Sequence, residues 1–151
     1  MMGLSYKWTG GPRMCFNAHK HWVLGWFSDR QAKILPAVRP WKGRLLAFTD
    51  YHKALAGDFV LIHFSDVYLQ YNRALDANVQ VLEKQNQVII TQADGQESTS
   101  ELIAGLEEGF RTDYKNYKIE FCSRTSYSAD RQYALIQVSR ISDNVSCLKS
   151  K

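Results

Sequence analysis

The sequence predicts an α+β fold in which a loop and one short helix precede a mostly antiparallel, β-sandwich-like region. Near the amino end, a helix-capping residue, Asn17, and a helix-ending residue, Gly25, bracket a short segment. After Pro36, apolar residues recur with the period of strands, and turn-forming residues separate the runs. With 151 residues that are 45% hydrophobic, the chain can bury a core, so a disordered protein is excluded.

The residues before Asn17 are rich in glycine, which predicts a loop. Asn17 is expected to cap a helix over Ala18–Leu24, and Gly25 is expected to end it. Because Ala18 and Trp22 lie one helical turn apart, we expect Trp22 to pack the helix onto the layer beneath it.

Six runs have the pattern of strands: Gly43–Thr49, Phe59–Phe64, Val67–Tyr71, Val88–Gln92, Tyr117–Cys122 and Tyr133–Val138. The sequence Lys118-Ile119-Glu120-Phe121 alternates polar and apolar residues, as a half-buried strand does. The segment Ser98–Glu108 fits a helical turn as well as a strand, so both remain open.

Charge is distributed unevenly along the chain. The residues up to Lys53 carry a net charge of +7 and the remainder −3, which gives the overall +4. The basic residues are spaced singly among apolar ones and do not form a run, so we expect no nucleic-acid partner. Apolar stretches are only a few residues long, which excludes a membrane-spanning helix in this chain.

The sequence contains no complete catalytic or metal-binding motif. His19 and His21 lie two residues apart, so on a helix they point in different directions and cannot share a metal ion. H-E-x-x-H, G-x-S-x-G and phosphate-binding glycine motifs do not occur. We therefore predict no catalytic residue and no metal ligand here. The triplet at residues 144–146 makes Asn144 a candidate for N-glycosylation.

Several stretches together resemble one protein family. Met2-Gly3 is followed by residues 14–22, MCFNAHKHW, and residues 24–26, LGW. This segment is similar to the region after the catalytic helix of the gametolysin-like zinc metallopeptidases, in which a methionine–glycine turn precedes a C-(F/L/Y)-N-A-x-K-x-W-x-L-G-W motif. The resemblance continues through residues 71–73, 86–88 and 100–106, and so extends over nearly the whole chain.

The resemblance implies a function for the longer protein. Members of the family are secreted metzincin-type endopeptidases that degrade cell-wall glycoproteins, and their zinc ligands lie in an H-E-x-x-H-type motif before the Met-turn. Only one residue precedes Met2 here, so we expect a fragment without the zinc-binding half, inactive alone and holding no zinc. Met2 and Gly3 correspond to the Met-turn, where the methionine supports the metal site from below; Met1 is a near-equal alternative.

The resemblance also implies a division of the chain. Residues 1–35 would end the catalytic domain with the Met-turn-like loop and the helix, and residues 36–151 would form the carboxyl-terminal β-rich region. Cys15, Asn17, Trp22, Gly25 and Trp26 are the structural residues of the motif. The partner would be a protein or glycoprotein substrate, and the location extracellular or the cell wall, although the amino end has no signal-peptide pattern.

Two further expectations concern cysteines and tryptophans. We expect Cys122 to pair with Cys147, which leaves Cys15 for a cysteine in the missing half. We expect Trp22 and Trp26 both to pack inward. The alternative function is a non-catalytic β-sandwich module that binds glycoprotein or glycan, for which exposed tryptophans would provide stacking surfaces.

Overall fold

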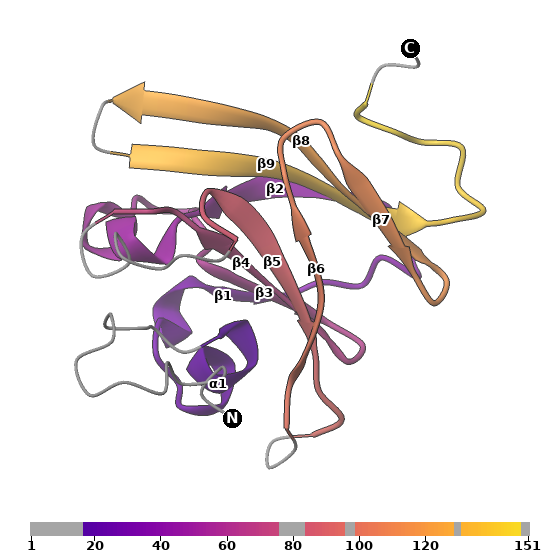
Figure 1. Cartoon of the computed structure of the whole chain (residues 1–151), viewed down its shortest axis with the longest axis horizontal. Coiled ribbons are helices and arrows are strands. Elements are labelled where there is room, and N and C mark those ends of the chain that lie inside the picture. Colours follow the sequence, from indigo (N-terminus) through magenta and orange to yellow (C-terminus); the bar gives the residue numbers. More distant parts are fainter. Residues whose placement is uncertain (1–16, 76–83, 96–98, 129–130, 149–151) are drawn as a thin grey trace.

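Two β-sheets pack face to face, and a short helix lies on the outer side of one of them (Figure 1). The computed structural model describes residues 17–75, 84–95, 99–128 and 131–148. The five-stranded sheet has the order β1 (Gln31–Lys33), β3 (Leu61–Phe64), β4 (Val67–Asn72), β5 (Gln87–Gln92) and β6 (Glu101–Leu106). The four-stranded sheet has the order β2 (Trp41–Leu46), β9 (Arg131–Arg140), β8 (Tyr117–Ser128) and β7 (Arg111–Tyr114). The helical elements are α1 (Ala18–Val23) and the 3₁₀ helices η1 (Ser28–Arg30) and η2 (Phe48–Lys53).

The predicted fold class, a short helix followed by a mostly antiparallel β-sandwich, is confirmed. Every strand pairing is antiparallel except that between β1 and β3. Because β1 pairs with β3, residues 1–35 and residues 36–151 contribute strands to one sheet. The ambiguous segment Ser98–Glu108 contains strand β6.

Two predicted strands are wrong at one end: the run Phe59–Phe64 becomes a strand only from Leu61, and the run Gly43–Thr49 ends early. The run Gly43–Thr49 does not continue as a strand past Leu46, because the chain turns into η2. Within η2, Asp50 is fully buried, and its carboxylate accepts hydrogen bonds from the Arg73 guanidinium at 2.7 Å and the Gln132 backbone amide at 3.2 Å. A strand would place this carboxylate elsewhere. Its pairing with Arg73 satisfies a buried charge that would otherwise be costly.

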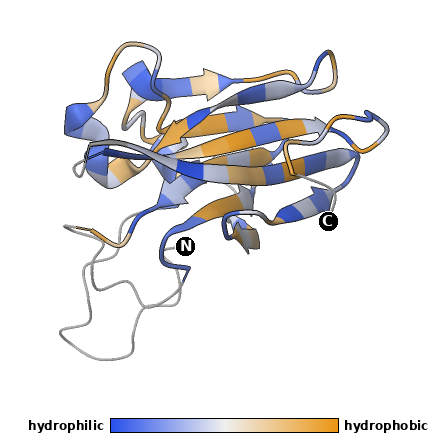
Figure 2. Ribbon diagram, turned by 90° about the horizontal axis from the view of Figure 1, so that it is seen from above, coloured by the Kyte–Doolittle hydropathy of each residue, from blue (hydrophilic) through white to orange (hydrophobic). Residues whose placement is uncertain are grey.

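The main core lies between the two sheets. Apolar and polar residues alternate along several strands, as the colours of Figure 2 show. Alternate side chains of a strand point to opposite faces, and the apolar ones from both sheets form this buried core. Ile62 and Phe64 from β3 meet Ile119 and Phe121 from β8 in this core.

A second apolar cluster lies on the outer face of the five-stranded sheet. There, Leu61 and Tyr68 pack with Ala18 from α1 and Phe48 from η2. Strand β4 therefore faces apolar side chains on both sides, and all six of its residues are buried.

The carboxyl-terminal tail covers the outer face of β8. Lys118 donates to the Val145 carbonyl at 2.6 Å, and Glu120 accepts from the Cys147 backbone amide at 3.1 Å. Cys122 forms a disulfide with Cys147. Lys118 and Glu120 lie two residues apart on β8 and so share its outer face, while Cys122 lies at the bulge between Phe121 and Ser123 and is joined there to the tail. The alternation in residues 118–121 therefore marks a strand whose polar side chains are covered, since Glu120 is fully buried and Lys118 is 8% exposed.

We expect removal of the disulfide to lower the free energy of unfolding by about 3 kcal/mol, since the bond closes a 25-residue separation. The measurement is urea unfolding of the parent and of the double variant Cys122→Ser/Cys147→Ser, each with and without reductant. Reductant should shift the parent and leave the double variant unchanged. A parent whose unfolding midpoint ignores reductant would contradict the expectation.

Candidate functional site

Two hairpin turns, one from each sheet, meet at one end of the sandwich. The β3–β4 turn consists of Ser65 and Asp66, and the β7–β8 turn consists of Lys115 and Asn116. Ser65 and Lys115 both have a φ of 51°, in the left-handed region that side-chain-bearing residues seldom adopt. A positive φ at the first turn residue is the usual geometry of two-residue hairpins, because it matches the twist of the flanking strands.

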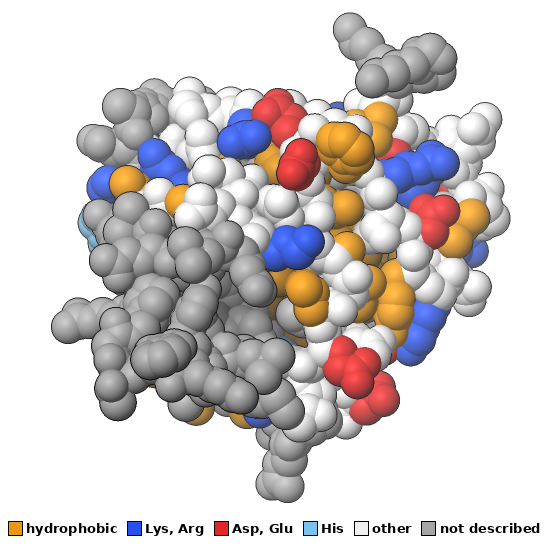
Figure 3. Space-filling model, in the orientation of Figure 1, with side chains coloured by type: hydrophobic (Ala, Val, Ile, Leu, Met, Phe, Trp, Pro, Cys, Tyr) orange, Lys and Arg blue, Asp and Glu red, His pale blue; other side chains and the backbone are white. Residues whose placement is uncertain are grey.

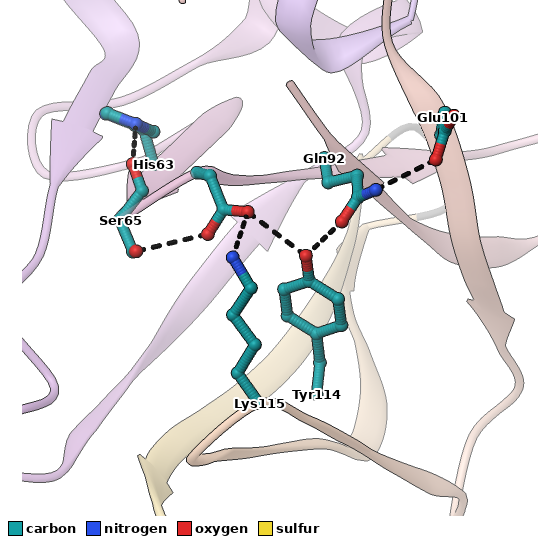
Figure 4. Close-up of polar contacts among 7 residues, drawn as sticks. His63, Ser65, Gln92, Glu101, Tyr114 and Lys115 are labelled. Atoms are coloured by element: carbon teal, nitrogen blue, oxygen red, sulfur yellow. Dashed lines mark hydrogen bonds and ion pairs between the residues drawn. The ribbon is translucent and has the colours of Figure 1, made fainter. Parts of the chain in front are cut away.

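Asp66 is the centre of a polar network that joins these turns (Figure 4). Its carboxylate accepts hydrogen bonds from Lys115 Nζ at 2.7 Å and from Ser65 Oγ at 3.1 Å. The Tyr114 hydroxyl lies 3.0 Å from the same carboxylate and also contacts the side-chain oxygen of Gln92. The network therefore connects the two sheets at their turns.

A surface hollow of about 560 Å³ lies beside this network. Its lining is polar and apolar in nearly equal parts and comprises His63, Ser65, Asp66, Tyr68, Ala93, Asp94, Gly95 and Lys115. These residues come from β3, β4, the β7–β8 turn and the segment after β5. The hollow is open to solvent, and the Ser65 hydroxyl and the Lys115 ammonium at its edge are bonded to the Asp66 carboxylate.

The protonation states at this site are set by the ion pair. Burial alone raises the pKa of Asp66, but hydrogen bonds from Lys115, its own backbone amide, Tyr114 and Ser65 together hold that pKa below its usual value. The hydrogen bond to Asp66 raises the pKa of Lys115. The pKa of Tyr114 is raised mainly by burial of its hydroxyl, and further by the hydrogen bond to the Asp66 carboxylate. All three groups therefore keep one protonation state around neutral pH, which suits binding better than proton transfer.

A second group of residues fastens α1 to the outer face of the five-stranded sheet; we call it the histidine interface and define it as His19, His21, Trp22, His63, Tyr68 and Gln70. His19 and His21 are 0% and 2% exposed. His19 Nε2 donates to the Gly95 carbonyl at 3.0 Å, and His21 Nδ1 donates to Gln70 Oε1 at 2.9 Å. The His63 ring stacks on Tyr68 with centroids 4.4 Å apart.

Asn17 and Gly25 act as the sequence predicts. The Asn17 side chain accepts a hydrogen bond from the Lys20 backbone amide at 3.1 Å and caps the helix. It also donates to Ser100 Oγ at 2.6 Å, which links the start of α1 to the region before β6. Gly25 follows the helix with a φ of 69°, as a helix-ending glycine commonly does.

The expectation for the two tryptophans is half wrong. Trp22 packs against the second apolar cluster, and its ring lies 4.9 Å from that of His63. Trp26 does not pack inward: it is 50% exposed and touches His21 with one side of its ring, at a centroid distance of 5.6 Å. The left-handed turn at Gly25 reverses the chain, so Trp26 does not follow Trp22 onto the sheet.

The remaining predicted residues divide into two groups. Met2, Gly3 and Cys15 lie outside the described residues. Asn144 is exposed on the tail, while Ser146 of the same triplet donates to buried Glu120. Within the described ranges, no group of three or more His, Cys, Asp or Glu side chains could hold a metal ion, so no zinc ligand is assigned to them. No helix in the part of the chain that the structure describes has the length and apolarity needed to cross a bilayer.

Sequence reasoning missed Asp66 and Lys115. They are 49 residues apart, and only the pairing of distant turns brings them together.

No protein-family model matches the chain, and neither a curated protein nor a solved structure is significantly similar to it.

We expect Trp22→Ala to lower the free energy of unfolding by about 3 kcal/mol, because it removes packing between α1 and the sheet. Trp26→Ala serves as the matched control and should cost less than about 1 kcal/mol, since its indole is half exposed. Urea unfolding of both variants beside the parent measures the difference. Equal losses in the two variants would contradict the packing described above.

Proposed function

We propose that this chain is the carboxyl-terminal, non-catalytic part of a secreted gametolysin-like zinc metalloendopeptidase that acts on extracellular or cell-wall glycoproteins. The proposal starts from the motif shared with that family at Cys15, Asn17, Trp22, Gly25 and Trp26. The catalytic zinc belongs to the preceding half of the longer enzyme.

The observation that carries the proposal is that the motif residues attach α1 to the β-sandwich. Asn17 caps α1 and bonds to Ser100, Trp22 packs on the sheet, and Gly25 turns the chain toward β1. The motif residues thus hold the start of α1 on the sandwich. Residues with this task suit a family in which a catalytic half comes directly before a β region.

Two features of the tail support secretion. Disulfides persist mainly in oxidising compartments, and Cys122 and Cys147 form one here. Asn144 is exposed, as a glycan acceptor must be. Each feature fits a protein that passes through the secretory pathway.

We expect the gene to encode an in-frame H-E-x-x-H motif a few dozen residues before Met1. A protein extended to include this motif should hydrolyse cell-wall glycoprotein when loaded with zinc, whereas the chain alone should not. The control is the same extended protein with the motif glutamate changed to glutamine, because this carboxylate acts as general base in such sites. Absence of the motif, or stoichiometric zinc retained by the chain alone during dialysis against a weak chelator, would contradict the proposal.

A second candidate is a module that binds glycoprotein or glycan, and the exposed indole of Trp26 favours it. Under this alternative, Trp26→Ala should reduce affinity for cell-wall glycoprotein at least about tenfold without changing the unfolding midpoint, since stacking contributes to binding alone. Sedimentation of the chain with purified glycoprotein measures the affinity. Unchanged binding by Trp26→Ala would exclude this indole as the ligand platform.

A further inference from the structure

Helix α1 depends on its contact with the sheet. It has six residues, and an isolated helix of that length is unstable in water. Its own side chains supply the docking contacts, and two of them, His19 and His21, are almost completely buried. Docking of the helix therefore requires burial of these two imidazoles.

The surroundings of His19 favour its neutral form. Its Nε2 donates to the Gly95 carbonyl, so this nitrogen carries the proton. Its Nδ1 is buried and has no hydrogen-bond partner among the described residues. A second proton on Nδ1 would create a buried charged donor without an acceptor, which is costly.

His21 lies in a largely aromatic environment. Its Nδ1 donates to Gln70 Oε1, which is neutral, and its ring lies 5.1 Å from that of Phe27 and 5.7 Å from that of Phe48. The Gln70 side chain and these two aromatic rings are uncharged. Burial lowers the pKa of His21, and the hydrogen bond to Gln70 only partly offsets this effect.

His63, on strand β3, has the same arrangement of ring nitrogens as His19. Its Nε2 donates to the Ser65 carbonyl at 2.8 Å, and its Nδ1 is buried without a partner within the described part of the chain. The Tyr68 ring contacts both His63 and His19, at centroid distances of 4.4 and 5.0 Å. Two unprotonated Nδ1 atoms thus belong to rings packed on one tyrosine.

The charged groups that face these histidines are mostly basic. Lys20 on α1 acts on His19, while Lys33 on β1 and His19 itself act on His63. Asp66 is the carboxylate that acts on His63, and it is already paired with Lys115. Burial, the largest cause in each case, lowers the pKa of His19 and of His63.

From this geometry we propose that the histidine interface is a pH-sensitive contact: α1 docks on the sheet while His19, His21 and His63 are neutral, and it detaches when they are protonated. The detached or unfolded segment takes up protons near the ordinary histidine pKa of about 6.5, whereas the docked segment takes them up only at lower pH. Docking is therefore fully stable above about pH 6.5 and weakens as the pH falls below that value. The sandwich itself remains, because its main core and its disulfide do not involve these residues.

The direct test is hydrogen exchange of the full chain between pH 7.5 and 5, corrected for the intrinsic pH dependence of exchange. Protection of amides in residues 18–24 should fall by up to about tenfold per pH unit for each proton taken up, while amides of β8 and β9 keep theirs. Unchanged protection of α1 down to pH 5 would overturn the proposal.

Variants identify the histidines responsible. His19→Gln retains a donor near the Nε2 position, and His21→Asn retains one near Nδ1, so the double variant keeps both hydrogen bonds without the titration. Its α1 should show less pH dependence than the parent. His52→Gln is the matched control, since His52 is exposed on η2, and it should behave as the parent does. A double variant that keeps the full parental pH dependence would contradict the assignment to His19 and His21.

A measurement on the unmodified chain covers the case in which the double variant does not fold. Nitrogen NMR of the imidazole rings at pH 7.5 should show the Nε2–H tautomer for His19 and the Nδ1–H tautomer for His21. Both rings should titrate together with the loss of α1 protection. Titration of either ring at its ordinary pKa while α1 stays protected would show that docking and protonation are independent.

Discussion

Strand β4 determines the layered structure because it is buried on both faces. Val67, Leu69 and Tyr71 point into the core between the sheets, while Tyr68 and Gln70 point outward beneath α1. Both faces of this strand are covered in the structure. The helix, the 3₁₀ segment η2 and the four-stranded sheet supply those covers, so their positions follow from the sequence of one six-residue strand.

The longer strands could be predicted because their pattern is local. Residues 117–122 and 133–138 alternate in a way that is visible without knowing their neighbours. Strands β1 and β7 carry few apolar residues, and only pairing with β3 and β8 makes them strands. The helix could be predicted for the same reason, because its capping residue, Asn17, and its ending residue, Gly25, lie next to it in the sequence.

The candidate site could not be predicted because its contacts are non-local. Asp66 and Lys115 meet through two turns in different sheets, and neither turn has the glycine that usually marks a positive φ. Gly95 lines the hollow and also accepts the hydrogen bond from His19. The hollow and the histidine interface are therefore adjacent, and movement of α1 would alter the shape of the hollow.

On the face of the molecule seen in Figure 3, acidic and basic side chains are interspersed.

The two ends of the described chain are held in different ways. Asn17 begins a helix that rests on the five-stranded sheet through noncovalent contacts, whereas Cys147 is joined covalently to β8 on the outer face of the other sheet. A pulling force applied across the domain would therefore act on unequal attachments. The tail could peel back only as far as its disulfide, and the helix would give way first. Under such a force, the contact between α1 and the five-stranded sheet would be the mechanically weakest part of the domain.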